Sequence, residues 1–221
     1  MGRDESLIDH DPLDGDERLV DYFGEAWPVV SCFADLLRTH GQERGLLGPR
    51  ETARLWERHM LNSAALVPFV LGARSIIDLG SGAGLPGVVL AAMLPQVEVT
   101  LLEPKERRVR WLDEVVQELH LANVCVVRGR AEEMIGLIVA EVVVARAVGP
   151  LSQLYQWAVP LLGRSGRLVA LKGERAASEV EEGSTIAARV GIVQVEVCAT
   201  TVIDGVAPTT VVVARRAKNG D

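Results

Sequence analysis

Short apolar runs alternate with segments of helical periodicity over most of this chain. From residue 75 onward, runs with the length and composition of buried strands occupy 75–79, 97–102, 124–128, 142–145 and 167–171. Between them, apolar residues spaced three and four apart predict helices near 87–94, 107–119, 151–162 and 176–189. Because strands and helices alternate, the pattern predicts an α/β fold with a doubly wound, mostly parallel sheet.

The pattern changes on both sides of this region. Ahead of it, apolar residues at helical spacing predict two helices, over 26–38 and 51–67, which form an N-terminal helical cap. After it, two β-rich runs, 192–201 and 209–216, flank an Asp-Gly turn and predict a hairpin. The hairpin adds a C-terminal antiparallel edge to the parallel sheet.

Charge divides the chain further. Residues 1–25 hold nine acidic and two basic side chains, which account for the net charge of −7 of the 221-residue chain. We expect this segment to form a solvated, partly disordered tail. A helical extension over 26–68 and a main domain over 69–221 follow it. Together these two parts are balanced in charge, so they can carry a local basic face for a polyanion.

Composition excludes several classes of protein. No apolar run approaches the ~18 residues of a membrane-spanning helix, and the acidic N-terminus is unlike a signal peptide. Cys32, Cys125 and Cys198 are isolated and the four histidines are scattered. This argues against a disulfide framework and against a bound metal. We expect a cytoplasmic protein, and nothing in the sequence requires more than a monomer.

The most informative stretch is I-I-D-L-G-S-G-A-G-L-P-G, residues 76–87. It predicts a buried strand, a glycine loop and the start of a helix. Glycines let the backbone turn tightly and approach a ligand, and free N–H groups at a helix start face that ligand. Asp78, two residues before the first glycine, distinguishes the loop from the dinucleotide-binding G-x-G-x-x-G, and the sequence contains no P-loop.

A second carboxylate supports a nucleotide-like ligand. Glu103 follows the strand over 97–102, about 20 residues beyond the loop, where a ribose diol is held. The alternative is a tight turn whose glycines serve packing, with Glu103 as a solvated strand end. The combination resembles motif I and the acidic second loop of class I S-adenosylmethionine-dependent methyltransferases. That resemblance implies a Rossmann-like fold and S-adenosyl-L-methionine as cofactor.

Charged or glycine residues follow each predicted parallel strand. In chain order they are Gly80, Glu103, Arg128 to Glu132, Arg146 and Lys172. Ligands bind at the carboxyl ends of such strands, and acidic and basic groups there suit a ribose and a phosphate-bearing substrate. Solvated loop charges are the alternative.

The stretch K-E-R-R-V-R, residues 105–110, places four basic residues at a helix start, against the helix macrodipole. One interpretation is a cluster that holds a polyanion backbone. The other is pairing with Glu106, Asp113 and Glu114 on a solvated face. The sequence leaves both open, and Trp111 just beyond is predicted to lie in the core.

A narrower resemblance rests on six motifs in a fixed order. They are R-H-M-L-N-S (58–63), D-L-G-S-G-A-G-L-P-G (78–87), R-R-V-R-W-L (107–112), R-A-E-E (130–133), A-R-A (145–147) and A-L-K-G (170–173). Together they resemble the small-subunit (16S) ribosomal RNA guanine-N7 methyltransferase family over roughly residues 26–216. One departure is G-L-L-G (45–48), where family members commonly carry Asn-Leu-Thr, so a polar contact from the cap is absent or supplied elsewhere.

The resemblance implies roles for particular residues. Those implied to contact the cofactor are Gly80, Gly82, Leu85, Glu103, Ala131, Glu132 and Arg146. Those implied to face RNA are His59, Arg107, Arg108, Arg130 and Lys172. For His59 the alternative is a structural role, as a hydrogen-bonded histidine within a helix. The sequence without the motif favours this alternative, and only the matched R-H-M-L-N-S context favours the functional role. The implied partner is small-subunit ribosomal RNA or an assembling small subunit.

The implied reaction is methyl transfer to N7 of a guanine. N7 carries an in-plane lone pair and no proton, so the reaction needs alignment and no general base. The sequence also lacks the Asn/Asp-Pro-Pro-aromatic tetrapeptide of amino-group methylases and the Pro-Cys of pyrimidine C5 methylases. Two alternatives stay open: a methyltransferase acting on a small molecule or protein, which the acidic net charge favours, and a non-catalytic regulator that binds the cofactor.

Overall fold

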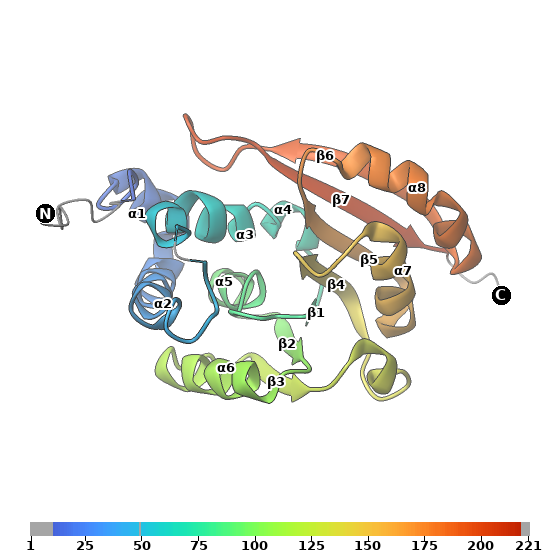
Figure 1. Ribbon diagram of the computed structural model, residues 1–221, viewed down its shortest axis with the longest axis horizontal. Helices are drawn as coiled ribbons and strands as arrows, with labels where there is room; N and C mark the ends of the chain where they lie inside the picture. Colours follow the sequence, from blue (N-terminus) through green and yellow to red (C-terminus); the bar gives the residue numbers. More distant parts are fainter. Residues whose placement is uncertain (1–10, 49, 218–221) are drawn as a thin grey trace, which may run out of the picture.

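The strands form one seven-stranded sheet in the order β3-β2-β1-β4-β5-β7-β6 (Figure 1). This computed structural model describes residues 11–48 and 50–217. The strands are β1 (Ser75–Leu79), β2 (Glu98–Glu103), β3 (Val124–Arg128), β4 (Ala140–Arg146), β5 (Leu162–Lys172), β6 (Ile192–Thr200) and β7 (Thr209–Arg216). β1 to β5 are parallel, whereas β7 pairs antiparallel with both β5 and β6. The doubly wound, mostly parallel sheet with a C-terminal antiparallel hairpin is therefore confirmed.

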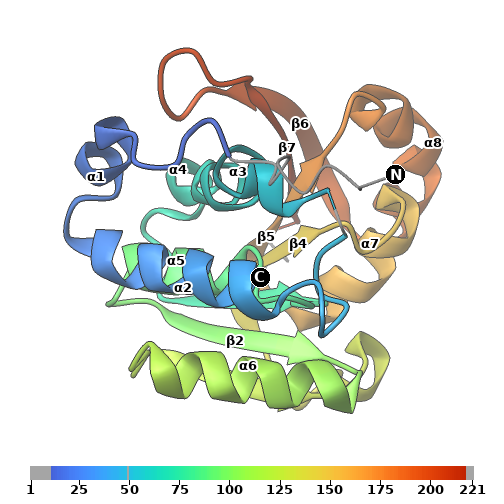
Figure 2. The same cartoon turned by 60° about the vertical axis from the view of Figure 1, so that its left-hand side comes forward.

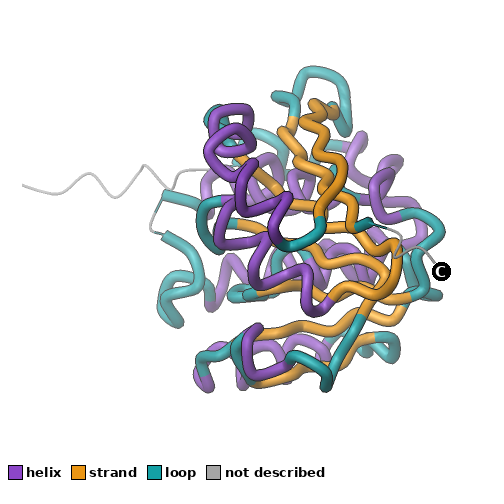
Figure 3. The backbone as a smooth tube through the Cα atoms, turned by 90° about the vertical axis from the view of Figure 1, so that its right-hand side faces the viewer, coloured by secondary structure: helices purple, strands orange, loops and turns teal. Residues whose placement is uncertain are grey.

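Alternate residues of each strand are buried against opposite faces of the sheet. Ile76 and Val144 pack into one core, whereas Ile77 and Val143 pack into the other. Helices cover both faces (Figure 3). The first face carries α5 (Gly87–Met93) and α6 (Glu106–Glu118), and the second carries α7 (Leu151–Ala158) and α8 (Ala176–Arg189). Burial on both faces explains why the central strands are apolar at nearly every position.

The N-terminal helices extend the core of the first face (Figure 2). They are α1 (Glu17–Phe23), the 3-10 turn η1 (Gly24–Ala26), α2 (Trp27–His40), the 3-10 turn η2 (Thr52–Arg54), the π-helix η3 (Trp56–Leu61), α3 (Asn62–Ala64) and α4 (Val67–Val70). Two further 3-10 turns are η4 (Ala131–Met134) and η5 (Val159–Leu161). The helix predicted over 26–38 is confirmed as α2. The single helix predicted over 51–67 is wrong, because 3-10, π and α segments divide that stretch.

The tail predicted over residues 1–25 is wrong for the part that the structure describes, and residues 1–10 lie outside that part. Leu19 and Phe23 of α1 are buried in the core. Asp11 is 2% exposed, and its carboxylate accepts a hydrogen bond from the Trp56 N–H at 2.8 Å. Asp16 caps α1 by accepting from the Arg18 N–H at 2.9 Å. Acidic side chains thus serve as acceptors for backbone groups here, a role that a count of charges does not reveal.

The loop between β6 and β7 lies against the N-terminal helices. Asn62 Nδ2 donates to Thr209 Oγ1 at 3.2 Å, and Arg18 Nη1 donates to the Asp204 carbonyl at 2.6 Å. Val202 and Ile203 pack against the core of the first face. The cap and the hairpin therefore meet beside the carboxyl ends of the strands. None of the helices within the described ranges is long and apolar enough to span a bilayer.

Candidate functional site

The strand order reverses between β1 and β4, which opens a crevice at their carboxyl ends. Gly80 directly follows β1, and Arg146 is the last residue of β4. Two neighbouring cavities lie there and share Gly80 and Arg108. The ligand site that the sequence predicts at these strand ends therefore coincides with cavities in the structure.

The glycine loop between β1 and α5 adopts a backbone path that side chains disfavour. Gly80, Gly82 and Gly84 have φ angles of 73°, 56° and 103°. Gly87 begins α5, and its N–H donates to Asp78 Oδ2 at 3.0 Å. Trp111, buried as predicted, donates through Nε1 to the carbonyl of Ala83 in the middle of the loop at 2.9 Å. The loop is therefore held from β1 and from α6.

Asp78 is fully buried beneath this loop, and burial raises the pKa of its carboxyl group to about 7. Between pH ~4, where an unfolded Asp loses its proton, and pH 7, the folded state binds more protons than the unfolded state. The contribution of Asp78 to stability therefore falls as pH rises through this window.

We expect Asp78→Asn to remove this pH dependence, since an Asn oxygen still accepts from the Gly87 N–H. The free energy of unfolding of the variant minus that of the wild type is expected to rise from pH 5 to 7, by up to about 1.4 kcal/mol per pH unit. Urea unfolding at pH 5, 6, 7 and 8 measures this. A constant difference across that range contradicts the assignment.

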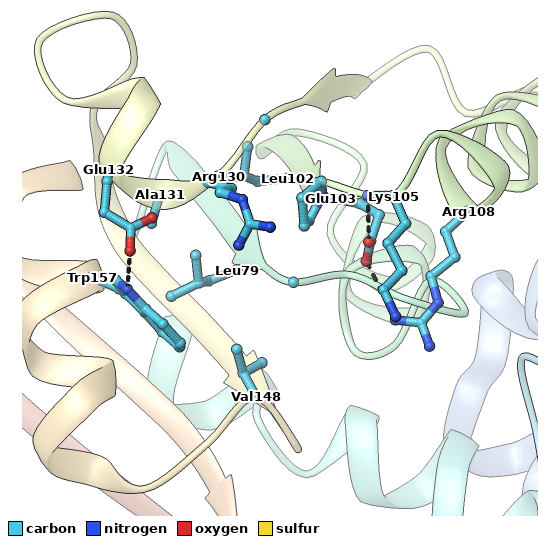
Figure 4. Close-up of a pocket in the computed structure, with 13 residues that line it drawn as sticks. Leu79, Leu102, Glu103, Lys105, Arg108, Arg130, Ala131, Glu132, Val148 and Trp157 are labelled. Atoms are coloured by element: carbon cyan, nitrogen blue, oxygen red, sulfur yellow. Dashed lines mark hydrogen bonds and ion pairs between the residues drawn. The ribbon is translucent and has the colours of Figure 1, made fainter.

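The first cavity, called the strand-end cavity, encloses about 190 Å³ between the ends of β1, β2 and β3 (Figure 4). Glu103 lies on one side of it, 2% exposed, and accepts from the Gly82 N–H at 3.0 Å and the Lys105 N–H at 2.9 Å. Leu79, Leu102 and Ala131 supply apolar walls. A buried carboxylate beside an apolar slot fits a nucleoside, with the ribose hydroxyls on Glu103 and the base between the walls.

Trp157 closes the opposite side of the strand-end cavity, and the sequence analysis missed it. Its Nε1 donates to Glu132 Oε1 at 2.5 Å, so α7 and η4 are joined across the opening (Figure 4). Trp157 lies on an amphipathic helix, where an aromatic residue ordinarily indicates core. Nothing in its local sequence identifies it as a wall of a ligand site.

The second cavity, called the cap cavity, lies between the glycine loop and the N-terminal helices. Leu46 and Leu47, from the G-L-L-G departure, line it, so the cap presents apolar side chains here. Arg146 also borders it and donates through Nη2 to His59 Nδ1. Burial, with help from the charge of Arg146, lowers the pKa of His59 to about 3. The imidazole is therefore neutral.

Comparison with known proteins identifies the family. The protein-family model GidB, described as "rRNA small subunit methyltransferase G", matches residues 28–203. A ribosomal RNA small subunit methyltransferase G from Mycobacterium sp. (strain JLS) is 50% identical over 200 residues, which cover 88% of each chain. One of the same name from Thermobifida fusca (strain YX) is 55% identical over 160 residues, covering 72% of this chain and 68% of that one. This chain belongs to the GidB family.

Solved structures confirm the Rossmann-like methyltransferase fold of this GidB member. A precorrin-6y C5,15-methyltransferase from Geobacter metallireducens GS-15 aligns with a TM-score of 0.55 at 15% identity, over 78% of this chain and 91% of that one. A SAM-dependent O-methyltransferase from Thermotoga maritima aligns with a TM-score of 0.52 at 15% identity, over 79% and 68%. At these identities the likeness concerns the fold alone.

The residues of the crevice fit S-adenosyl-L-methionine. Glu103 and the apolar slot suit its adenosine, and the glycine loop allows close approach of its centre. Arg146 keeps a donor unused beside this loop, since Nη1 is buried and has no hydrogen-bond partner within the described part of the chain. The structure thus brings together the predicted contacts Gly80, Glu103, Ala131 and Glu132 in the strand-end cavity. The predicted contacts Gly82, Leu85 and Arg146 lie in the adjoining cap cavity.

The basic residues implied to face RNA in this GidB member occupy different environments. Arg107 is exposed beside Gly45, Arg108 lines both cavities, and Arg130 is exposed at the strand-end cavity. The Lys172 side chain is 9% exposed, and its ammonium donates to the Gly149 carbonyl and to Glu179. The RNA-facing role of these residues stays a prediction, and Lys172 can take it only if its ammonium exchanges these partners.

The helix start at 105–110 supports both interpretations of its basic residues in part. Arg110 pairs with Glu106, which also pairs with Arg128 at 2.9 Å. Arg107 and Lys105 make no ion pair with any residue that the structure describes. No group of three His, Cys, Asp or Glu side chains in the described ranges is arranged to hold a metal ion.

Proposed function

We propose that this chain transfers a methyl group from S-adenosyl-L-methionine to N7 of a guanine in small-subunit ribosomal RNA. The observation that carries the proposal is the crevice at the strand reversal, where the glycine loop and the buried Glu103 border a cavity that fits a nucleoside, in a member of the GidB family. The relatives' name supplies the substrate class. In this proposal free RNA or an assembling small subunit is the partner, and a cytoplasmic location is part of the proposal because such a substrate is found there.

The chain's own groups act by binding and alignment. When bound, S-adenosyl-L-methionine supplies a methyl group activated by a sulfonium. Glu103, the glycine loop and Arg146 fix the donor, so that an incoming guanine meets it in line. N7 has no proton to lose, which agrees with the chemistry of the cap cavity: His59 is buried, bonded to Arg146, and unsuited to act as a base near neutral pH.

The charges around the crevice favour RNA over the alternative of a small molecule or protein substrate, despite the acidic total charge. Lys105 and Arg130 line the strand-end cavity, and Arg58 lines the adjoining groove beside Asn62. Arg107 lies beside Gly45, next to Leu46 of the cap cavity, and all four basic side chains are exposed. None of them forms an ion pair with another residue in 11–48 or 50–217. Cations without partners at a concave surface are suited to phosphates.

We expect Arg58→Ala and Arg107→Ala each to weaken RNA binding and to reduce the slope of log K against log salt by about 0.7 to 1, because each removes one phosphate contact. Arg189→Ala is the matched control, since Arg189 is also exposed but is the last residue of α8 and lines neither of the two cavities nor the groove. Fluorescence anisotropy with a labelled RNA fragment over 50 to 300 mM salt, roughly the range in which phosphate contacts respond, measures this. Equal slopes for all proteins would contradict an RNA-binding face here.

The function itself is tested with purified protein, S-adenosyl-L-methionine and either small-subunit RNA or small subunits that lack the modification. Borohydride–aniline cleavage maps 7-methylguanosine, and we expect one new site. If the protein binds the cofactor normally but leaves every N7 unmodified in both substrates, the proposed substrate is wrong.

A further inference from the structure

The backbone around His59 forms a π-helix, an uncommon type of helix. His59 lies in this helix, η3, in which backbone bonds run from i to i+5 and shift the inward face by one residue relative to an α-helix. The Ser63 hydroxyl donates to the His59 carbonyl at 2.6 Å. The side chain is only 2% exposed and lines the cap cavity together with the glycine loop. Such π-turns are rare and are concentrated at functional sites.

The contacts of His59 fix its tautomer. An arginine offers only donors, so the bond from Arg146 Nη2 requires a lone pair on His59 Nδ1. The proton therefore sits on Nε2, which faces Glu51 Oε2 at 3.5 Å. His59 is thus a neutral acceptor that links η3 to the end of β4.

The Arg146 guanidinium is held through one of its terminal nitrogens, and the other is left without a hydrogen-bond partner among the residues described. Nη2 is bonded to His59, whereas Nη1 is buried and without a partner among the residues described. The next residue, Ala147, has a φ of 53°, which an alanine rarely adopts, so the backbone here is held against its preference. A buried guanidinium with an unused donor beside the glycine loop is prepared for an anionic group.

We infer that His59 is a positioning residue: it holds Arg146 so that the guanidinium binds the carboxylate in the methionine part of the cofactor. His59 does not touch RNA in this arrangement, in contrast to the role that the family resemblance implies. The inference rests on the proposed function only in taking S-adenosylmethionine as the cofactor.

Two nucleosides test it without RNA. S-adenosylhomocysteine carries the carboxylate, whereas 5′-methylthioadenosine has the same adenosine and sulfur but lacks the amino-acid part. We expect His59→Leu and Arg146→Met each to weaken S-adenosylhomocysteine binding about tenfold or more, and to change 5′-methylthioadenosine binding less than about twofold. His59→Asn, whose amide oxygen can replace Nδ1 as acceptor, is expected to restore most of the affinity. The double variant should bind no more weakly than Arg146→Met alone.

Isothermal titration calorimetry gives the dissociation constants, and circular dichroism checks that each variant is folded. Equal weakening of both nucleosides by His59→Leu indicates a merely structural role and overturns the inference. If His59→Leu and Arg146→Met bind both nucleosides like the wild type but raise the KM for RNA, the inference is also overturned, because Arg146 then faces RNA. If His59→Leu does not fold, an unchanged ratio of affinities in Arg146→Met overturns it equally. Failure of the wild type to bind either nucleoside refutes the proposed function instead.

Discussion

Replacing Gly87 with alanine is expected to destabilise the protein by about 3 kcal/mol, because no room exists for a methyl group at the start of α5. A Cβ at this position would lie 2.3 Å from Leu101 Cδ2 and 2.6 Å from Asp78 Oδ2. Asp78 Cβ, which is fixed to the backbone of β1, would lie at 2.9 Å, and the Leu101 and Asp78 side chains are both fully buried, so they have little space to turn aside. Urea unfolding of the variant and the wild type measures the loss.

Gly163→Ala is the matched control for this substitution. A Cβ there would meet its nearest neighbour, the Ala140 carbonyl, at an ordinary 3.6 Å. We expect a change of less than about 1 kcal/mol at Gly163. A similarly small change at Gly87 would show that β1 and β2 yield easily, contrary to the close packing described here.

Replacing Glu103 with glutamine is expected to weaken binding of S-adenosylhomocysteine about 30-fold, equivalent to about 2 kcal/mol. The carboxylate loses its charge-assisted bonds to the ribose hydroxyls. In addition, a glutamine NH₂ group must face a donor, since the Gly82 and Lys105 N–H groups each bond to one of the two Glu103 oxygens. Isothermal titration calorimetry measures the affinity.

Glu98→Gln is the control, because Glu98 is exposed at the other end of the same strand. It should bind S-adenosylhomocysteine like the wild type. If Glu103→Gln stays within about threefold of the wild type, Glu103 does not hold the ribose, and the strand-end cavity needs another occupant.

The sheet could be predicted from the sequence because its central strands are buried on both faces. That burial forces continuous apolar runs such as Ile76–Ile77 and Val142 to Val144, and glycines or charged residues mark where each run ends. The start of β5 was missed for a related reason. The first residues of β5, from Leu162, include Arg164 and Ser165, so they form no apolar run that would predict a strand. They also pair with β4 through a register shift.

The cap was predicted less well, because its form depends on long-range partners. Helical spacing cannot distinguish a π-turn from an α-turn, so it gave no sign that η3 directs His59 into the crevice. Likewise, Asp11 stabilises the Trp56 backbone from 45 positions away in the chain. Trp157 meets its partner Glu132 only when α7 packs against η4, and Lys172 meets Glu179 only when α8 packs beside β5.

The position of β7 has a consequence for how the chain is made. This strand lies between β5 and β6, although it follows both in the sequence. A nascent chain therefore leaves the ribosome with the edge of β5 over Arg167–Lys172 uncovered until residues 209–216 have emerged. Thr209, the first of these residues, bonds to Asn62 and forms part of the groove beside Asn62. That part of the groove is therefore also missing until residues 209–216 have emerged. Translation must pass residue 216 before this fold can be completed, and a polypeptide stalled earlier presents an open strand to its neighbours.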